Sequence, residues 1–154
     1  MAQILVVAHA PLASALLAVA RHVYPECSQQ LAAVDVPADL QQDDAQDLLR
    51  QSLQSLTRGL QGHAADVLVL TDVFGATPCN AALAVADGVH VRVVAGLNVP
   101  MLWRALCYGA QPLDDMVVRA VTGGTQGVMQ VAVPRRQNQG LPAGRHDPGH
   151  SQDQ

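Results

Sequence analysis

The segment "ILVVAHAPLASALL" (residues 4–17) joins an apolar run to the start of a helical pattern through a single imidazole. Its first five residues, ILVVA, are typical of a strand buried on both faces of a parallel sheet. His9 ends this run, and after Pro11 apolar residues recur at helical spacing until Tyr24 and Pro25. The segment therefore predicts a buried strand, then a helix, with His9 at the junction.

The rest of the chain repeats this alternation of strand and helix. Further strands are expected at residues 31–36, 66–72, 90–96 and 127–133. Further helices are expected from the polar QQDDAQ segment to Gly59 and Gly62, from Pro78 to Asp87 and Gly88, within 97–109, and within 111–124 up to two glycines. This order predicts an α/β fold, with a doubly wound and mostly parallel sheet flanked by helices.

Composition limits the function classes that need considering. A chain of 154 residues fits one domain, which we place at 1–133, followed by a polar, disordered tail at 134–154. The net charge of −4, with nine arginines and no lysine, argues against nucleic acid as a partner. No apolar run approaches the roughly 18–20 residues of a membrane span, so we expect no membrane insertion. Three separated cysteines without a CxxC pair argue against disulfides and a metal site, and favour the cytoplasm.

Polar side chains follow three of the expected strands at the point where each ends. His9 follows the first strand, Asp72 the third and Asn98 the fourth. Ligands of an open parallel sheet bind beyond the carboxyl ends of its strands. We therefore expect these three residues at one edge of the sheet, where a site would form.

The turn "TDVFGATPCNAAL" (residues 71–83) predicts an anion site at this edge. Gly75 permits a tight turn close to a ligand. Thr77 followed by Pro78 is typical of an N-cap and the first residue of a helix, whose free N–H groups bind phosphate. The nucleotide motifs GxxxxGK[ST] and GxGxxG do not occur. The turn thus indicates a small phosphate, or a phosphoryl group carried on the protein itself.

His9 is the natural carrier of such a phosphoryl group. A neutral histidine has a lone pair on one ring nitrogen, and a carboxylate such as Asp72 would orient the ring through the other. Taken singly, each residue also has a structural interpretation. His9 could be a loop residue, and Asp72, Thr77 and Asn98 could cap turns or helices. A hydrolase using Ser14 and His9 is disfavoured, because no G-x-S-x-G motif is present.

Three segments resemble the IIA component of the mannose family of the bacterial phosphoenolpyruvate:sugar phosphotransferase system (PTS). They are "ILVVAHAPLASALL", "TDVFGATPCNAA" and "VAGLNVPML", and the resemblance covers about residues 3–133. It implies that His9 accepts a phosphoryl group from the phosphohistidine of HPr and passes it to a IIB component. It also implies that Asp72 orients His9. The phosphate-binding residues that we expect are Gly75, Ala76, Thr77 and Asn98.

On this resemblance the chain is a phosphotransferase that works through a transient phosphohistidine, without a cofactor or a metal. Members of the family are typically homodimers that exchange their last strand, and "GVMQVAV" (127–133) fits that role. Two alternatives stay open: a regulatory protein as acceptor, and a regulatory module that binds partners according to its phosphorylation state. A relative that feeds a dihydroxyacetone kinase is disfavoured by the segment 77–80. Ala10 departs from the glycine that often follows the histidine of this family.

Overall fold

A computed structural model describes residues 2–58 and 65–133 of the chain. Four parallel strands form one sheet in the order β2–β1–β3–β4. The strands are β1 (Gln3–His9), β2 (Leu31–Val36), β3 (Val67–Thr71) and β4 (Val91–Ala95). The helices are α1 (Leu12–Val23), the short 3₁₀ helix η1 (Cys27–Gln30), α2 (Gln42–Thr57), α3 (Thr77–Val85), α4 (Val99–Cys107) and α5 (Leu113–Gln126). The predicted α/β fold with a parallel sheet is confirmed.

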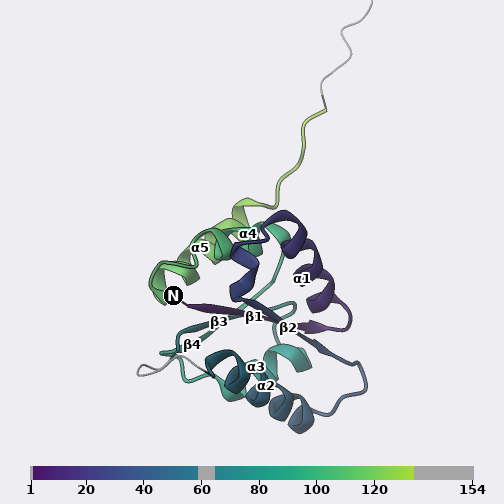
Figure 1. Ribbon diagram of the computed structural model, residues 1–154. Helices are drawn as coiled ribbons and strands as arrows, with labels where there is room; N and C mark the ends of the chain where they lie inside the picture. The colour runs from purple at the N-terminus through teal and green to yellow at the C-terminus, as the bar shows by residue number, and fades with distance from the viewer. Residues whose placement is uncertain (1, 59–64, 134–154) are drawn as a thin grey trace, which may run out of the picture.

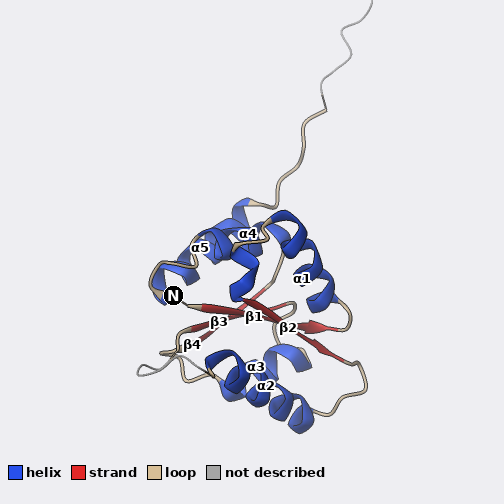
Figure 2. Cartoon of the chain, viewed as in Figure 1, coloured by secondary structure: helices blue, strands red, loops and turns tan. Residues whose placement is uncertain are grey.

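Helices cover both faces of the sheet, as Figures 1 and 2 show, with α1, α4 and α5 on one side and α2 and α3 on the other. Successive residues of β1 point to opposite layers. Ile4 and Val6 pack in the core beneath α1, α4 and α5, whereas Leu5 and Val7 pack against α2 and α3. This double coverage explains why residues 4–8 of β1 and 67–70 of β3 are all apolar and do not alternate with polar residues.

The register of the strands brings their carboxyl ends to one edge of the sheet. His9 is paired with Val36 of β2, and Thr71 of β3 is paired with Val7 and Ala95. The residues that follow β1 and β3 therefore meet at this edge although they are far apart in the sequence. The backbone N–H of Gly96, just after β4, donates to the Asp72 carbonyl at 3.1 Å and joins the fourth strand to the same place.

The expected end of the last helix at two glycines is wrong, because α5 continues through both of them to Gln126. A Cβ atom on Gly123 would lie 2.2 Å from Cγ of Arg104, and one on Gly124 would lie 2.8 Å from Cε of Met101. The glycines therefore let α5 pack closely against α4. They serve helix packing, and they do not terminate the helix.

The strand expected at 127–133 is absent from the single chain. Its four large apolar side chains, Val128, Met129, Val131 and Val133, are 71–83% exposed. A strand forms only where a second strand completes its hydrogen bonds, and within residues 2–58 and 65–133 this segment pairs with none. Gly59, Gly62 and the tail at 134–154 lie outside the described residues.

None of the helices in the two described ranges is both long and apolar enough to span a bilayer.

Candidate functional site

His9 and Asp72, which the sequence predicted to lie at one edge of the sheet, are in direct contact. Nδ1 of His9 lies 2.7 Å from Oδ2 of Asp72, and the backbone N–H of His9 donates to the same oxygen at 3.0 Å. The other carboxylate oxygen of Asp72 accepts the N–H of Val73 at 2.8 Å. The carboxylate is nearly buried, at 9% exposure, whereas the imidazole is 45% exposed. The ring is thus anchored through Nδ1 while nearly half of the side chain stays exposed.

The environment of Asp72 favours its ionised form. Burial alone would raise its pKa, but the N–H of His9, the His9 ring and the N–H of Val73 all hydrogen-bond to the carboxylate. Together these contacts lower the pKa of Asp72 below its ordinary value. An ionised carboxylate can only accept, so Nδ1 of His9 carries the proton of the shared hydrogen bond. In the neutral ring, the lone pair is then on Nε2.

Helix α3 begins at this edge directly after the turn that follows Asp72. Gly75 has a φ of +83°, which an L side chain rarely adopts, and its carbonyl accepts the side-chain amide of Asn80 at 2.9 Å. The expected N-cap at Thr77 is wrong by one position: Ala76, in an extended conformation, is the N-cap, and Thr77 is the first helical residue. No side chain caps this helix. Its first N–H groups, including that of Thr77, lack intrahelical partners and are the donors that could bind an anion.

Asn98 lies at the start of α4 and its side chain is already engaged there. Its Oδ1 accepts the N–H of Met101 at 2.9 Å, and its Nδ2 donates to the carbonyl of Gly124 at 3.0 Å. Asn98 therefore caps α4 and ties it to α5. The capping interpretation that the sequence left open is confirmed, and binding of phosphate by Asn98 stays a prediction.

Asp35, near the carboxyl end of β2, contacts the helix that follows His9, and the sequence did not single it out. Its Oδ1 accepts the backbone N–H of Ser14, in the first turn of α1, at 3.1 Å. The sequence nevertheless contains a clue. Asp35 is the single polar residue of the otherwise apolar segment LAAVDV, as His9 is the polar residue that ends the apolar run ILVVA.

Three exposed apolar side chains lie close to His9 or Asp72 in the sequence, and the sequence analysis did not single them out. Val73 and Phe74, which follow Asp72, are 56% and 78% exposed, and Leu12, at the start of α1, is 40% exposed. All three residues belong to the segments that leave the carboxyl ends of β3 and β1.

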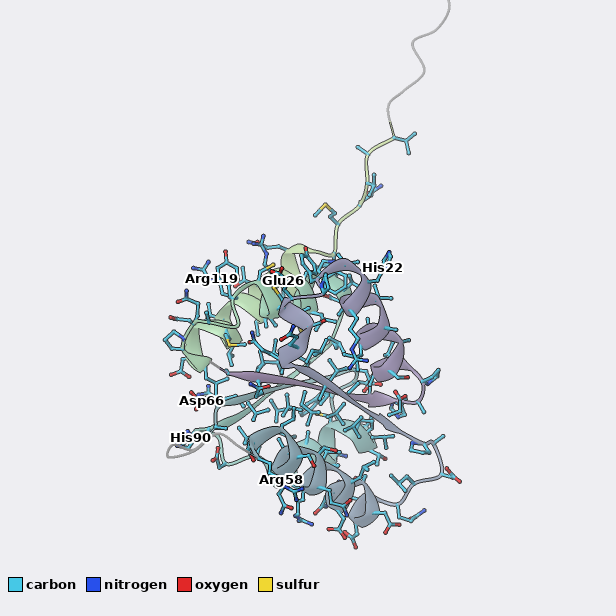
Figure 3. All side chains as sticks on the ribbon, viewed as in Figure 1. His22, Glu26, Arg58, Asp66, His90 and Arg119 are labelled. Carbon is cyan, nitrogen blue, oxygen red and sulfur yellow. The ribbon has the colours of Figure 1, made fainter. Side chains whose placement is uncertain are left out.

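A second histidine–aspartate pair lies at the opposite end of the strands, where β3 and β4 begin. Nδ1 of His90 is 2.9 Å from Oδ1 of Asp66, and Figure 3 shows both side chains at the outer end of the sheet. Both side chains are more than 40% exposed, so the carboxylate is not enclosed as that of Asp72 is. His90 and Asp66 thus make the same type of contact as His9 and Asp72, but their carboxylate is exposed and not enclosed. Among residues 2–58 and 65–133, no three side chains of His, Cys, Asp or Glu are grouped as metal ligands.

Comparison with known proteins agrees with these features. The family model EIIA-man, described as PTS system fructose IIA component, matches residues 3–122. The mannose-specific EIIAB component of the PTS of Escherichia coli K12 is 42% identical over 65 residues, which are 40% of this chain and 20% of that protein. The chain thus matches about a fifth of that relative's length.

Solved structures extend the similarity to most of the chain. The mannose/sorbose-specific IIA subunit from Enterococcus faecalis superimposes with a TM-score of 0.76 at 26% identity, covering 88% of this chain and 98% of that one. The EIIA component from Streptococcus agalactiae has the same fold, with a TM-score of 0.70 at 24% identity, covering 84% and 97%.

Proposed function

Since the chain belongs to the EIIA-man family of IIA components of the sugar phosphotransferase system, we propose that it carries a phosphoryl group on His9. The observation that supports this most directly is the contact of 2.7 Å between Nδ1 of His9 and the enclosed carboxylate of Asp72. The proposed donor is the phosphohistidine of HPr, and the proposed acceptor is a IIB component or a regulatory protein, in the cytoplasm. The intermediate is a transient phosphohistidine, without a resident cofactor.

The chemistry follows from the protonation of the pair. The Nε2 lone pair of His9 attacks the phosphorus of the donor phosphohistidine, so a new N–P bond forms while the N–P bond of the donor breaks and its electron pair returns to the donor ring. The proton on Nδ1 stays in its hydrogen bond to Asp72, whose negative charge stabilises the positive charge that develops on the His9 ring. Transfer to the acceptor is the same reaction in reverse, with the acceptor nucleophile attacking the phosphorus.

The phosphoryl oxygens are proposed to contact the turn at Gly75, Ala76 and Thr77. Helix α3 starts in this turn without a side-chain cap, so its N–H groups and its dipole can stabilise the negative charge. The positive φ of Gly75 shapes the turn that leads from Asp72 into this helix. Asn98 is the fourth proposed phosphate contact, and it would have to give up part of its capping role to make it.

The exposed side chains of Leu12, Val73 and Phe74 are proposed to form the surface on which donor and acceptor dock. A phosphocarrier must bind two proteins in turn at one nucleophile, so a small apolar surface around His9 suits short-lived complexes. Phe74, at 78% exposure, is the side chain best suited to anchor a partner.

A homodimer that exchanges residues 127–133 is also part of the proposal. The segment is mostly apolar and exposes Val128, Met129, Val131 and Val133. Strand β4 is an edge strand of the sheet, so one of its sides can accept a further strand. Pairing the segment of one copy with the sheet of another would complete the backbone hydrogen bonds and cover these side chains.

Phosphorylation of purified protein tests the main proposal. Incubation with phosphoenolpyruvate, the general PTS kinase and HPr should label wild type in an acid-labile linkage. His9→Ala should not be labelled. His90→Ala is the matched control, because His90 is also paired with an aspartate through Nδ1, and it should be labelled like wild type. Equal labelling of wild type and His9→Ala would refute the assignment.

A further inference from the structure

Asp35 occupies the start of α1, beside the strand end that bears His9. Its carboxylate accepts the N–H of Ser14, the third residue of that helix, whereas Pro11 at the N-cap position caps nothing through its side chain. The backbone adds a second tie, because the N–H of Ala10 donates to the carbonyl of Val36 at 3.0 Å. The connection from His9 to α1 is therefore attached to β2 at two points.

The helices that start at this edge differ in what occupies their N-termini. Asp35 occupies that of α1, and Asn98 caps that of α4. Helix α2 has Asp43 and Asp44 in its first turn. Helix α3 has neither a side-chain cap nor an acidic residue in its first turn. Among the helix starts at this edge in residues 2–58 and 65–133, that of α3 is thus the one with neither a side-chain acceptor for its N–H groups nor an acidic residue in its first turn.

We infer that Asp35 is a positioning residue that directs the phosphoryl group on His9 to the start of α3 by occupying the start of α1. This inference rests on the proposed function. Without Asp35, two helix N-termini next to His9 would offer free N–H groups to the same anion. With Asp35 in place, the Ser14 N–H already has an acceptor, and the negative charge of the carboxylate repels a phosphoryl dianion from α1.

Two substitutions separate the hydrogen bond from the charge. Asp35→Ala frees the N–H of Ser14, whereas Asp35→Asn can retain an oxygen acceptor for it and removes only the charge. Asp39→Asn is the matched control, since Asp39 is an exposed carboxylate four residues further along the chain. If Asp35→Ala does not fold, Asp35→Asn still tests the effect of the charge, because it preserves an acceptor for the N–H of Ser14.

The first measurement is the shift of backbone amide signals in NMR spectra when the protein is phosphorylated. In wild type, phosphorylation should shift the amides of Thr77 and Cys79 and leave that of Ser14 nearly unchanged. In Asp35→Ala, the Ser14 amide should shift as well. The second measurement is the ratio of phosphorylated to free protein against a fixed ratio of phospho-HPr to HPr. Asp35→Asn should raise this ratio roughly two- to fivefold, and Asp39→Asn should not.

Two outcomes would overturn the inference. One is a Ser14 amide that does not respond to phosphorylation in folded Asp35→Ala. The other is a phosphorylation ratio for Asp35→Asn equal to that for Asp39→Asn. Absence of phosphorylation on His9 of wild type would instead refute the proposed function, so the two failures are distinct.

Discussion

Oδ2 of Asp72 accepts both the ring Nδ1 of His9, at 2.7 Å, and the backbone N–H of the same residue, at 3.0 Å, across 63 positions of the chain. One oxygen atom thus restrains the main chain and the side chain of His9 together. Rotation of the ring would break the shorter contact, while displacement of the loop would break the longer one. The orientation of Nε2 therefore depends on a single carboxylate.

Removing that carboxylate should impair phosphorylation. In Asp72→Asn the ring loses its anionic partner, and the amide can present a donor to Nδ1 and favour the wrong tautomer. We expect the rate of phosphorylation by phospho-HPr to fall on the order of 100-fold. The matched control is Asp66→Asn, which removes the partner of His90 at the other end of the strands. Equal rates in the two variants would show that Asp72 has no special role.

Asp72 should also make the free energy of unfolding depend on pH in the acidic range. Its pKa is lowered in the folded protein, so the folded state favours the ionised form. Its contribution is complete above the unfolded pKa of about 3.9 and is lost as pH falls through the lower folded value. The free energy of unfolding in urea should therefore differ more between wild type and Asp72→Asn at neutral pH than in strong acid. A difference that stays constant down to strong acid would contradict this.

Gly123→Ala should destabilise the protein despite the better helix propensity of alanine. The new Cβ would lie 2.2 Å from Cγ and 2.9 Å from Cβ of Arg104, and 3.2 Å from the carbonyl of Pro100. Separating α4 from α5 should cost about 1–3 kcal/mol, against a propensity gain of about 1 kcal/mol. Chemical denaturation measures the net loss. Gly124→Ala should cost less, because its nearest neighbour is the flexible end of Met101, and the reverse order would refute the packing argument.

Asn98→Ala should act mainly on stability. It removes the cap of α4 and the hydrogen bond to the Gly124 carbonyl, which together should cost about 1–2 kcal/mol. Thermal unfolding checks this value. Asn98→Asp, which retains the capping oxygen but cannot donate to Gly124, should lose less. If Asn98→Ala instead slows phosphorylation and leaves stability unchanged, binding of phosphate is its main role.

The proposed strand exchange predicts that a charge in the last segment weakens the dimer. Val131 is 79% exposed in the single chain, so Val131→Asp should not disturb its fold. Light scattering after size exclusion should show a shift from dimer to monomer. Leu83→Asp, at a 49% exposed position of α3, is the control for an added charge. A wild-type protein that is monomeric at all accessible concentrations would exclude the exchange.

The sequence pattern was sufficient to predict those elements whose formation depends mainly on residues that are neighbours in the chain. The mostly apolar runs predicted all four strands of the sheet to within one residue, because a parallel strand covered on both faces needs apolar side chains along most of its length. His9 and Asp72 were identified for a related reason: each ends such a run with a polar group. Asp35 carries the same signal, but a carboxylate inside a predicted strand does not disclose that Ser14 lies within its reach.

Tertiary structure decided what depends on contacts between distant segments. The sequence could not tell that Gly123 and Gly124 are required by the approach of α4, since glycine equally ends helices. Nor could it tell that residues 127–133 remain unpaired in one chain, since an apolar segment needs a neighbouring strand to become a strand. The sequence by itself predicted the order of the four strands and of the helices between them, and it singled out His9 and Asp72 as candidate residues of a site. The 2.7 Å contact between them, and the choice of which helix start stays open beside it, arise only when the carboxyl ends of parallel strands meet at one edge.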